Sequence, residues 1–409
     1  MSANPRNLQI AAFDYPLPAE KIAAYPLENR DQSRLLQFKN EQISDHCFQE
    51  LPNEIPSNTW LVFNETKVVP ARLIFEKNTG GRIEVFCLEP IAELGDMHQA
   101  LSNTQAVLIH CLVGGASKWK KGTVLTQEKE GIQLNVELKK KEQDSFVLSF
   151  SWRPAYYTFA EILAVFGQTP LPPYLKREAV ATDASRYQTV YATKEGSVAA
   201  PTAGLHFTPA IMQALDRRSI ARAQVILHVG SGTFKPVKAL TLSEHQMHYE
   251  WIEASLEFLK TWRMRVHQPL LAVGTTSLRT LESLYWMGVK IMNAHADSVP
   301  TLSQWEPYHL NTASISVQEA LDNLIQWMEI RKLDRLVTQT GLLVAPGYTI
   351  KTSSGLITNF HQPRSTLLLL VAALVGDDWK KIYSHALKND YRFLSYGDSS
   401  LLWRYDPIT

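Results

Sequence analysis

The sequence predicts an α/β protein with a mixed, largely parallel sheet that carries helices on both faces, together with a small inserted β-barrel. From about residue 153 onward, short apolar runs alternate with helical patterns, which is typical of a parallel sheet covered by helices. Between residues 71 and 152, short alternating runs such as RIEVFCLE and GIQLNVELK follow one another without a helical period. This series of short alternating runs indicates a small barrel or sandwich.

The chain of 409 residues is longer than one ordinary domain, so we expect two domains. Residues 1–70 and 153–409 are expected to form a discontinuous α/β domain, and residues 71–152 the inserted barrel. The formal net charge of +1 means that any contact with nucleic acid must be a local patch. The three cysteines are far apart and form no CxxC pair, which argues against a disulfide framework and a structural zinc site.

The N-terminal sequence lacks the charged-then-apolar pattern of a signal peptide. The most apolar run, residues 367–375, is far shorter than the roughly 20 residues that cross a bilayer. We therefore expect a soluble, cytoplasmic protein without membrane contact, and a monomer.

Local patterns predict the individual elements in order. Buried strands are expected at residues 60–63, 224–229, 270–273 and 356–360. Helices are expected at residues 159–166, from Ser316, at 278–287 and at 366–375. The pairs Thr158 and Glu161, and Ser316 and Glu319, have the spacing of a capping box. The helices over 159–166, 278–287 and 366–375 are expected to stop at Gly167, Gly288 and Gly376.

Five runs in the second half of the chain are too polar and too glycine-rich for a core. They are APTAGLHF (200–207), LHVGSGTF (227–234), GTTSLRTLES (274–283), TNFHQPRST (358–366) and YRFLSYGD (391–398). At least three of them lie where a buried strand leads into a helix. In open α/β sheets, ligands bind outside the carboxyl ends of strands, so these loops are the expected binding region.

In GTTSLRTLES, Gly274 permits a close backbone approach, and Thr275, Thr276 or Ser277 is expected to cap the following helix. The free N–H groups and the helix dipole would then face an anion, such as the carboxylate of a methionine moiety. Arg279 and Glu282 share a helix face near that end. A well-capped helix without a ligand is the alternative.

The run LHVGSGTF places Gly230, Ser231 and Gly232 after a strand, but Lys235 stands where a dinucleotide fingerprint needs its third glycine. A Rossmann site is therefore excluded. The backbone of this loop could approach a ribose or adenine, or form a tight structural turn. The chain has no GxxxxGK[ST] phosphate loop and no GxSxG nucleophile elbow, which weakens nucleotide hydrolase and esterase interpretations.

Among the histidines, His206 and His361 are the better candidates for chemistry, because each lies just before a helix start. A hydrogen-bonded structural histidine is the alternative for both. His245 and His248 have no HExxH pattern and no cysteine partner, so no metal site is expected.

Two further groups have both a functional and a structural interpretation. Arg392 and Asp398 bracket aromatic residues, which fits either a binding site or a docked C-terminal tail. The lysines of KWKKG, Lys118, Lys120 and Lys121, are interleaved with Trp119. They could form an RNA-backbone patch or protect an exposed strand edge.

The whole chain resembles the S-adenosylmethionine:tRNA ribosyltransferase-isomerase family of queuosine biosynthesis. Besides the five runs, the resemblance rests on FDYPLPAEKIAAYPLENRDQSRLL (13–36), VFNETKVVPARL (62–73), GGRIEV (80–85), PLPPY (170–174), YQTVYA (187–192) and EHQMHYE (244–250). The family fold is an α/β domain with a small β-barrel inserted near its N-terminal third.

The resemblance implies transfer of the ribosyl group of S-adenosylmethionine, rearranged to an epoxycyclopentanediol, onto 7-aminomethyl-7-deazaguanine at the tRNA wobble position. Adenine and methionine leave, epoxyqueuosine results, and no cofactor is expected beyond S-adenosylmethionine as cosubstrate. The reaction needs a base beside the sulfonium carbon and an aligned nucleophile. The expected base is His206 or His361, with His206 preferred and Glu282 and Asp398 as fallback carboxylates. The expected substrate-binding residues are Gly230, Ser231, Gly232, Thr275, Thr276, Ser277, Arg279, Asn359, Arg364 and Arg392.

Two departures from the family pattern leave a second interpretation open. The chain carries roughly 30 to 40 extra residues between the GTTS helix and PGY (346–348), and loops of that length are more often functional or lineage-specific than neutral. It also has Gln362 where an apolar residue is usual, and its end reads DSSLLW (398–403) where the family pattern has Ala-Met after the Asp. The alternative is therefore a paralogue that binds S-adenosylmethionine or tRNA but has a changed substrate or no catalysis.

Overall fold

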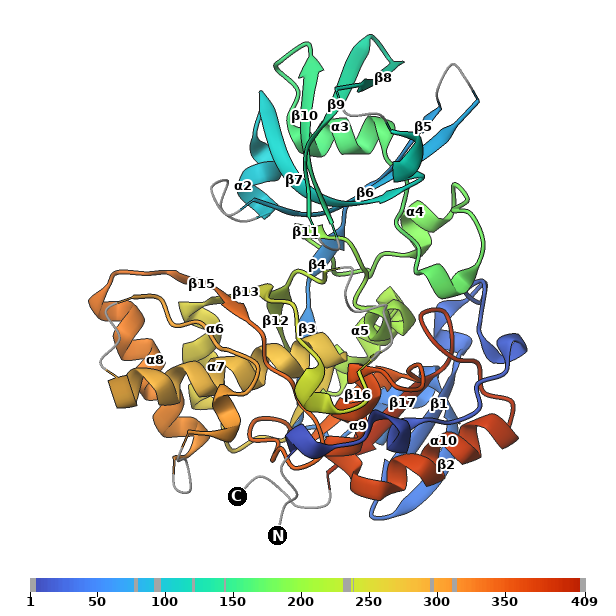
Figure 1. Cartoon of the computed structure of the whole chain (residues 1–409). Helices are drawn as coiled ribbons and strands as arrows, with labels where there is room; N and C mark the ends of the chain where they lie inside the picture. Colours follow the sequence, from blue (N-terminus) through green and yellow to red (C-terminus); the bar gives the residue numbers. More distant parts are fainter. Residues whose placement is uncertain are drawn as a thin grey trace.

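The computed structural model describes residues 5–76, 80–91, 97–119, 122–142, 145–230, 237, 239–294, 298–310 and 315–404. These residues form one nine-stranded sheet, one six-stranded sheet and a two-stranded pair of β4 (Thr66–Val68) and β11 (Lys194–Ser197). Figure 1 shows the six-stranded sheet standing apart from the nine-stranded sheet and its helices, with β4 and β11 between them.

The nine-stranded sheet has the order β15-β13-β12-β3-β14-β16-β17-β1-β2. Its strands are β1 (Arg34–Lys39), β2 (Gln42–Cys47), β3 (Trp60–Asn64), β12 (Ala221–Leu227), β13 (Glu250–Ser255), β14 (Leu270–Val273), β15 (Arg335–Thr340), β16 (Gly355–Asn359) and β17 (Ser399–Trp403). The four neighbouring strands β12, β3, β14 and β16 pair in parallel, as do β17 and β1. The remaining pairs are antiparallel. The sheet is therefore mixed, as expected, but "largely parallel" describes only its centre.

Helices cover both faces of this sheet, because alternate residues of its buried strands point to opposite sides. On β3, Trp60 and Val62 belong to one apolar cluster, and Leu61 and Phe63 belong to another. The first cluster includes side chains of α6 (Leu256–Met264), α7 (Thr275–Ala294), α8 (Val317–Ile330), α9 (Thr366–Val375) and α10 (Trp379–Lys388). The second includes side chains of α1 (Leu51–Glu54) and α5 (Pro209–Arg217).

Three helix predictions are confirmed with their boundaries. Both capping boxes form, at the starts of α3 (Phe159–Phe166) and α8, and Gly167 and Gly376 follow the last residues of α3 and α9. The prediction for α7 is wrong at its end, because the helix continues past Gly288 to Ala294. A Cβ at Gly288 would lie 2.0 Å from the carbonyl oxygen of Ala320, so this glycine allows α7 and α8 to pack closely instead of ending the helix.

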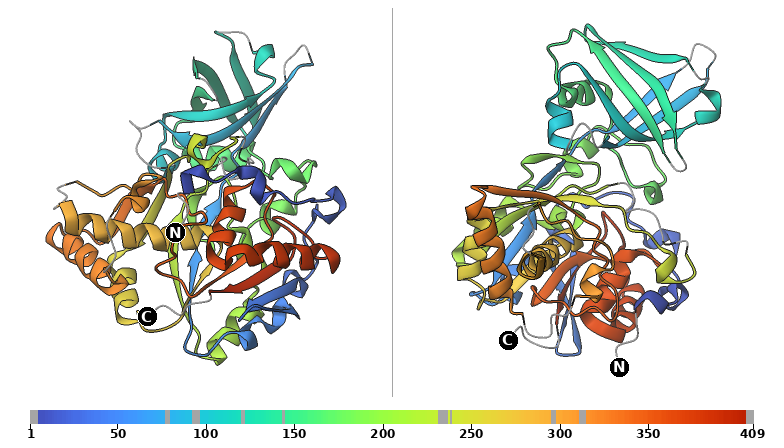
Figure 2. Two further views of the ribbon diagram at one scale, coloured as in Figure 1. Left: turned by 60° about the horizontal axis from the view of Figure 1, so that its bottom comes forward. Right: turned by 60° about the vertical axis from the view of Figure 1, so that its left-hand side comes forward.

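The six-stranded sheet is antiparallel throughout, with the order β5-β6-β7-β10-β9-β8. It comprises β5 (Arg72–Glu76), β6 (Arg82–Pro90), β7 (Ala106–Gly114), β8 (Val124–Lys129), β9 (Ile132–Lys141) and β10 (Phe146–Arg153). The sheet curls on itself (Figure 2), and Gln127 on β8 donates to the carbonyl of Ile74 on β5 at 2.5 Å. This contact links its two edges into a nearly closed barrel.

The apolar core of the barrel also contains Phe159 and Ile162 of α3, while α2 (Met97–Ser102) packs against α3. The division of the chain into domains at residues 71 and 152 stays a prediction. In the region of the expected extra residues, α8 packs against α6 and α7, and β15 forms the edge of the large sheet. Among the described residues, no helix is both long enough and apolar enough to cross a membrane.

Candidate functional site

A cavity lies where β12, β14 and β16 end, at the carboxyl side of the parallel strands. This is the edge at which open α/β sheets bind ligands. The described residues that line it come from all five expected runs, with Tyr174, Ala199 and Leu367 in addition: Ala200–Ala203, Val229, Gly274–Thr276, Thr358–Gln362 with Ser365, and Leu394–Ser395. The structure thus brings all five runs to one place.

The loop after β14 presents Gly274, Thr275 and Thr276 to the cavity. Gly274 has a φ of +89°, which suits glycine, and its N–H donates to the carbonyl of Ile357 at 2.8 Å. The helix α7 begins at Thr275, so Gly274 occupies the capping position and the expected cap by Thr275, Thr276 or Ser277 is wrong. Ser277 is fully buried and donates back to the carbonyl of Val273 at 2.7 Å.

Asn64, at the end of β3, fastens the strand ends behind this loop. Its amide group donates to the carbonyl of Leu227 at 2.9 Å and to the hydroxyl of Thr276 at 3.3 Å. Its carbonyl oxygen accepts from the N–H of Leu227 at 3.1 Å. Asn64 is not among the residues expected at the site from the sequence. Its position directly after the buried run WLVF, at the end of a strand, is the sequence signal that could have indicated it.

His206 lies beside the cavity, with both of its ring nitrogens engaged. Its Nε2 accepts from the amide of Asn359 at 3.1 Å, so the proton is on Nδ1, which lies 2.7 Å from the hydroxyl of Ser33. Asn359 lines the cavity and is oriented by the hydroxyl of Thr202, which donates to it at 2.9 Å. Burial lowers the pKa of His206 from 6.5 to about 3, with smaller contributions from the charges of Arg392 and Arg30.

His361 lines the cavity directly. Its Nε2 lies 2.9 Å from the hydroxyl of Thr358, and no described residue bonds to its Nδ1. The backbone at His361 is held on two sides, since its N–H donates to the hydroxyl of Tyr383 and its carbonyl accepts from that of Tyr15. Burial lowers the pKa of His361 to about 3, so the ring is neutral at pH 7.

Glu282 is fully buried and lies away from the cavity lining. Its carboxylate accepts from the backbone N–H groups of Lys351 and Thr352 at 2.8–3.1 Å, and from the hydroxyls of Thr352 and Tyr348 at 2.6 and 2.5 Å. Burial raises the pKa of this carboxyl, while these hydrogen bonds act in the opposite direction. The contacts tie α7 to the segment that precedes β16.

Asp398, Arg364 and Arg392 also lie outside the cavity lining. The carboxylate of Asp398 accepts from the backbone N–H groups of Arg34 and Arg392 at 3.0 and 2.8 Å, and from the Arg392 guanidinium at 3.3 Å. Arg364 is half-exposed and pairs with Asp14. All three fasten chain segments near the cavity. The role of Asp398 as a fallback base and those of Arg364 and Arg392 as substrate contacts stay predictions.

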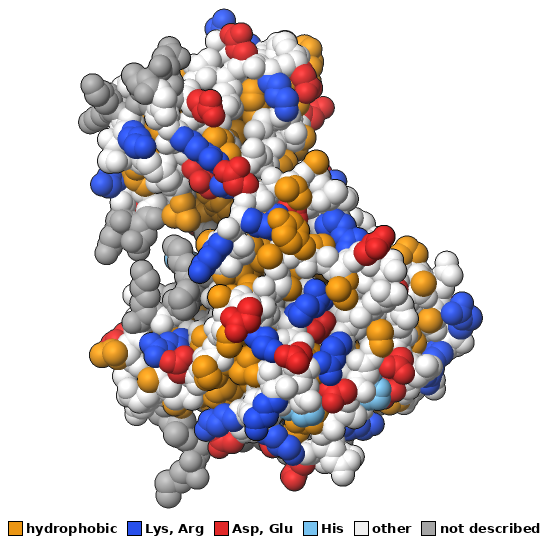
Figure 3. Space-filling model, turned by 90° about the vertical axis from the view of Figure 1, so that its right-hand side faces the viewer, with side chains coloured by type: hydrophobic (Ala, Val, Ile, Leu, Met, Phe, Trp, Pro, Cys, Tyr) orange, Lys and Arg blue, Asp and Glu red, His pale blue; other side chains and the backbone are white. Residues whose placement is uncertain are grey.

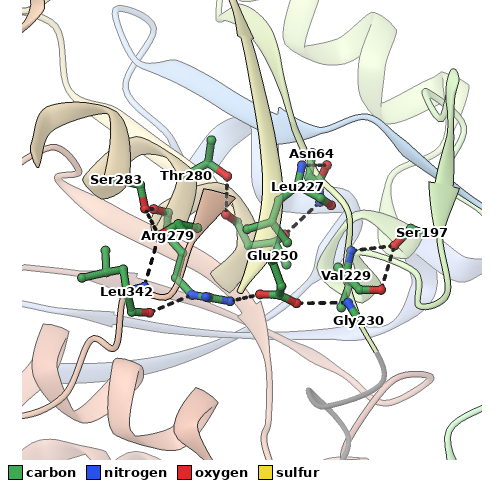
Figure 4. Close-up of polar contacts among 12 residues, drawn as sticks. Asn64, Ser197, Leu227, Val229, Gly230, Glu250, Arg279, Thr280, Ser283 and Leu342 are labelled. Carbon is green, nitrogen blue, oxygen red and sulfur yellow. Dashed lines mark hydrogen bonds and ion pairs between the residues drawn. The ribbon is translucent and has the colours of Figure 1, made fainter. Parts of the chain in front are cut away.

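Arg279 is buried and is linked through Glu250 to the backbone of Gly230, which follows the cavity residue Val229 (Figure 4). Its Nη1 donates to Glu250, and its Nε donates to the carbonyl of Leu342 at 3.2 Å. The other carboxylate oxygen of Glu250 accepts from the N–H of Gly230 at 3.1 Å, directly after the cavity residue Val229. The predicted contacts at Ser231 and Gly232 lie outside the described residues.

The barrel contributes Lys118, which is exposed at the end of a short 3-10 helix (Ala116–Lys118). Lys120 and Lys121 lie outside the described residues. On the face that Figure 3 shows, positive and negative side chains are interspersed over both parts of the molecule and do not form a patch of one sign.

Several cavity residues are not among those expected from the sequence. Tyr174 and Ser395 face the cavity, and their hydroxyls lie 2.5 Å apart. Burial raises the pKa of Tyr174 to about 12. Tyr174 belongs to PLPPY and Ser395 to YRFLSYGD, so both lie within motifs that carry the family resemblance. Among the described residues, no group of three or more His, Cys, Asp or Glu side chains could hold a metal ion.

Comparison with known proteins shows the family to which the chain belongs. A family model described as "Queuosine biosynthesis protein" matches residues 10–402. A protein of Thermotoga petrophila named S-adenosylmethionine:tRNA ribosyltransferase-isomerase is 37% identical over 400 residues, which cover 97% of this chain and 100% of that protein. A protein of Nitrosococcus oceani with the same name is 34% identical, covering 97% and 98%.

A crystal structure of S-adenosylmethionine tRNA ribosyltransferase from Thermotoga maritima aligns with 95% of this chain and 99% of its own, at 26% identity and a TM-score of 0.45. The family match extends over nearly the whole chain, and the named relatives are covered almost from end to end. The chain belongs to the S-adenosylmethionine:tRNA ribosyltransferase-isomerase family.

Proposed function

We propose that this protein transfers and isomerises the ribosyl group of S-adenosylmethionine onto 7-aminomethyl-7-deazaguanine at the wobble position of tRNA, giving epoxyqueuosine and releasing adenine and methionine. The observation that carries this proposal is the convergence of all five sequence runs on one cavity, in a chain that belongs to the family. A cytoplasmic location, where tRNA is modified, and action as a monomer go with the proposal.

S-adenosylmethionine is proposed to bind at the carboxyl ends of β12, β14 and β16. The N-terminus of α7, with Thr275 and Thr276, offers free N–H groups and a positive dipole end to the methionine carboxylate. The backbone of Val229 and of the adjoining Gly230 is proposed to contact the nucleoside part of S-adenosylmethionine. The cavity holds about 70 Å³, whereas ligand pockets usually hold at least about 300 Å³. Loops around it are therefore expected to move apart when the cosubstrate enters.

His361 is the group that we propose as the base, in preference to His206. A base needs a free nitrogen lone pair within reach of the substrate. In the tautomer that donates from Nε2 to Thr358, His361 has this lone pair on Nδ1, and the residue lines the cavity. His206 has both ring nitrogens engaged and instead orients Asn359. Burial lowers the pKa of both histidines to about 3 and keeps both rings unprotonated at neutral pH, so the preference for His361 rests on geometry alone.

For tRNA, the exposed Lys118 and its neighbours Lys120 and Lys121 are proposed to contact phosphate groups. If they do, the affinity falls with salt, and the slope of that dependence shrinks by about 0.9 for each contact removed on a duplex. A triple Lys→Gln variant that keeps the wild-type slope would show that these lysines only protect a strand edge.

The function is tested with purified protein, labelled S-adenosylmethionine and tRNA carrying 7-aminomethyl-7-deazaguanine. The expected result is epoxyqueuosine by nucleoside mass spectrometry, with equal amounts of adenine and methionine. tRNA with an unmodified guanine at the wobble position is the matched control. If only the unchanged 7-aminomethyl-7-deazaguanine is found, the chain is the paralogue with a changed substrate or without catalysis.

The base is tested by exchange of the 5′ protons of S-adenosylmethionine in deuterated water. His361→Asn is expected to lose exchange and turnover together, whereas His206→Asn should retain exchange at a reduced rate. Near-normal exchange in His361→Asn would assign the step to another group.

A further inference from the structure

The ion pair of Arg279 and Glu250 joins three parts of the structure that meet at the cavity edge. Arg279 is on α7, one turn after Thr275 and Thr276, and Glu250 is the first residue of β13. Both side chains are buried, with 6% and 7% of the residue exposed. Figure 4 shows Glu250 between the guanidinium and the backbone of Gly230, where one carboxylate serves both donors.

Fold stability does not account for this pair. Removing two charges from water is costly, and an apolar pair of similar size is often as stable or more stable. Arg279 also keeps its Nη2 without an acceptor among the described residues, although that nitrogen is buried. An incompletely satisfied buried charge is a cost that folds normally avoid. The position of the Arg279–Glu250 pair explains its presence better, because the carboxylate of Glu250 fixes the backbone that borders the cavity.

We propose that Glu250 is a positioning residue for S-adenosylmethionine. It ties the backbone N–H of Gly230 to Arg279, so that Val229 and the first turn of α7 face the cosubstrate in one fixed geometry. This inference rests on the proposed function. It differs from direct recognition by Arg279, since in that case the carboxylate would be dispensable for binding.

The chain offers a matched control on the same strand. Glu253 of β13 is also 7% exposed and also has an arginine partner, Arg335 of β15, at 3.0 Å. Glu253 makes no contact with Gly230 among the described residues. Arg335→Gln therefore removes the arginine from a buried carboxylate, as Arg279→Gln does, but leaves the contact to Gly230 intact and leaves Glu253 its second partner, His228, at 3.5 Å.

The test measures the Kd of S-adenosylmethionine by calorimetry, and KM and kcat with substrate tRNA, for Glu250→Gln, Arg279→Gln, their double variant and Arg335→Gln. Each single variant of the pair is expected to raise Kd and KM at least tenfold, with kcat reduced less than threefold. The double variant should bind within twofold of the weaker single variant, because both changes remove one contact. It removes both charges of the pair at once, so it tests the idea even if a single variant does not fold. Arg335→Gln should stay within twofold of wild type.

Two results would overturn the proposal. If Glu250→Gln binds like wild type while Arg279→Gln does not, Arg279 contacts the ligand directly and Glu250 positions nothing. If Arg335→Gln weakens binding as much as the pair variants do, the effect is a general loss of structure. A wild-type protein that binds S-adenosylmethionine but forms no epoxyqueuosine would refute the proposed reaction, and the Kd comparison would still decide whether Glu250 positions the cosubstrate.

Discussion

Replacement of Glu282 by leucine is expected to destabilise the fold by several kcal/mol. The carboxylate accepts from four donors, and two of them are backbone N–H groups, of Lys351 and Thr352, which cannot turn elsewhere. Each stranded buried donor costs about 1–3 kcal/mol, so the two N–H groups alone account for about 2–6 kcal/mol.

Glu282→Gln separates this structural role from a chemical one. An amide oxygen at the Oε1 position still accepts from Lys351 and Thr352, and the hydroxyl of Tyr348 can accept from the new amide instead of donating. A loss of about 1 kcal/mol is therefore expected. Because Glu282 lies outside the cavity lining, the glutamine variant should keep turnover within a few-fold of wild type.

The assay is urea denaturation of wild type, Glu282→Gln and Glu282→Leu, with adenine release measured on the same preparations. Stability should fall in the order wild type, glutamine, leucine, and activity should follow the folded fraction. A glutamine variant that is as stable as wild type but loses more than a hundredfold in turnover would refute the reasoning and make Glu282, the fallback carboxylate, the candidate base.

Urea titration also tests the pH dependence of stability and the close packing of α7 against α8. Burial lowers the pKa of His206 and His361 from 6.5 to about 3, so between these values the unfolded chain binds protons that the folded chain does not. The free energy of unfolding should therefore fall by about 1.4 kcal/mol per pH unit for each histidine as the pH drops, and replacing either by Gln should flatten this slope. Gly288→Ala should cost about 1–3 kcal/mol, because its Cβ would meet the Ala320 carbonyl and force α7 away from α8. An unchanged midpoint would mean that the two helices are not in tight contact.

The sequence by itself determined the local elements and the family. Capping boxes at Thr158 and Ser316, and Gly376 after an apolar run, are read within a few residues of the helix end that they specify. The alternation of β6 through β10 likewise marked the barrel. Such signals are local because the hydrogen bonds of a helix end lie within one turn, and the side-chain period of a strand is two residues.

Only the tertiary structure decided which polar residues meet. Within the single helix α7, Thr275 and Thr276 face the cavity, whereas Arg279 forms an ion pair with Glu250. Glu282 accepts hydrogen bonds from the segment before β16. Gly288 resembled a helix stop until its contact with α8 was known. The role of a buried polar side chain depends on the donors and acceptors that complete its hydrogen bonds, and here these come from segments distant in sequence. A local pattern supplies the residue, but the packing of the whole chain supplies its partner.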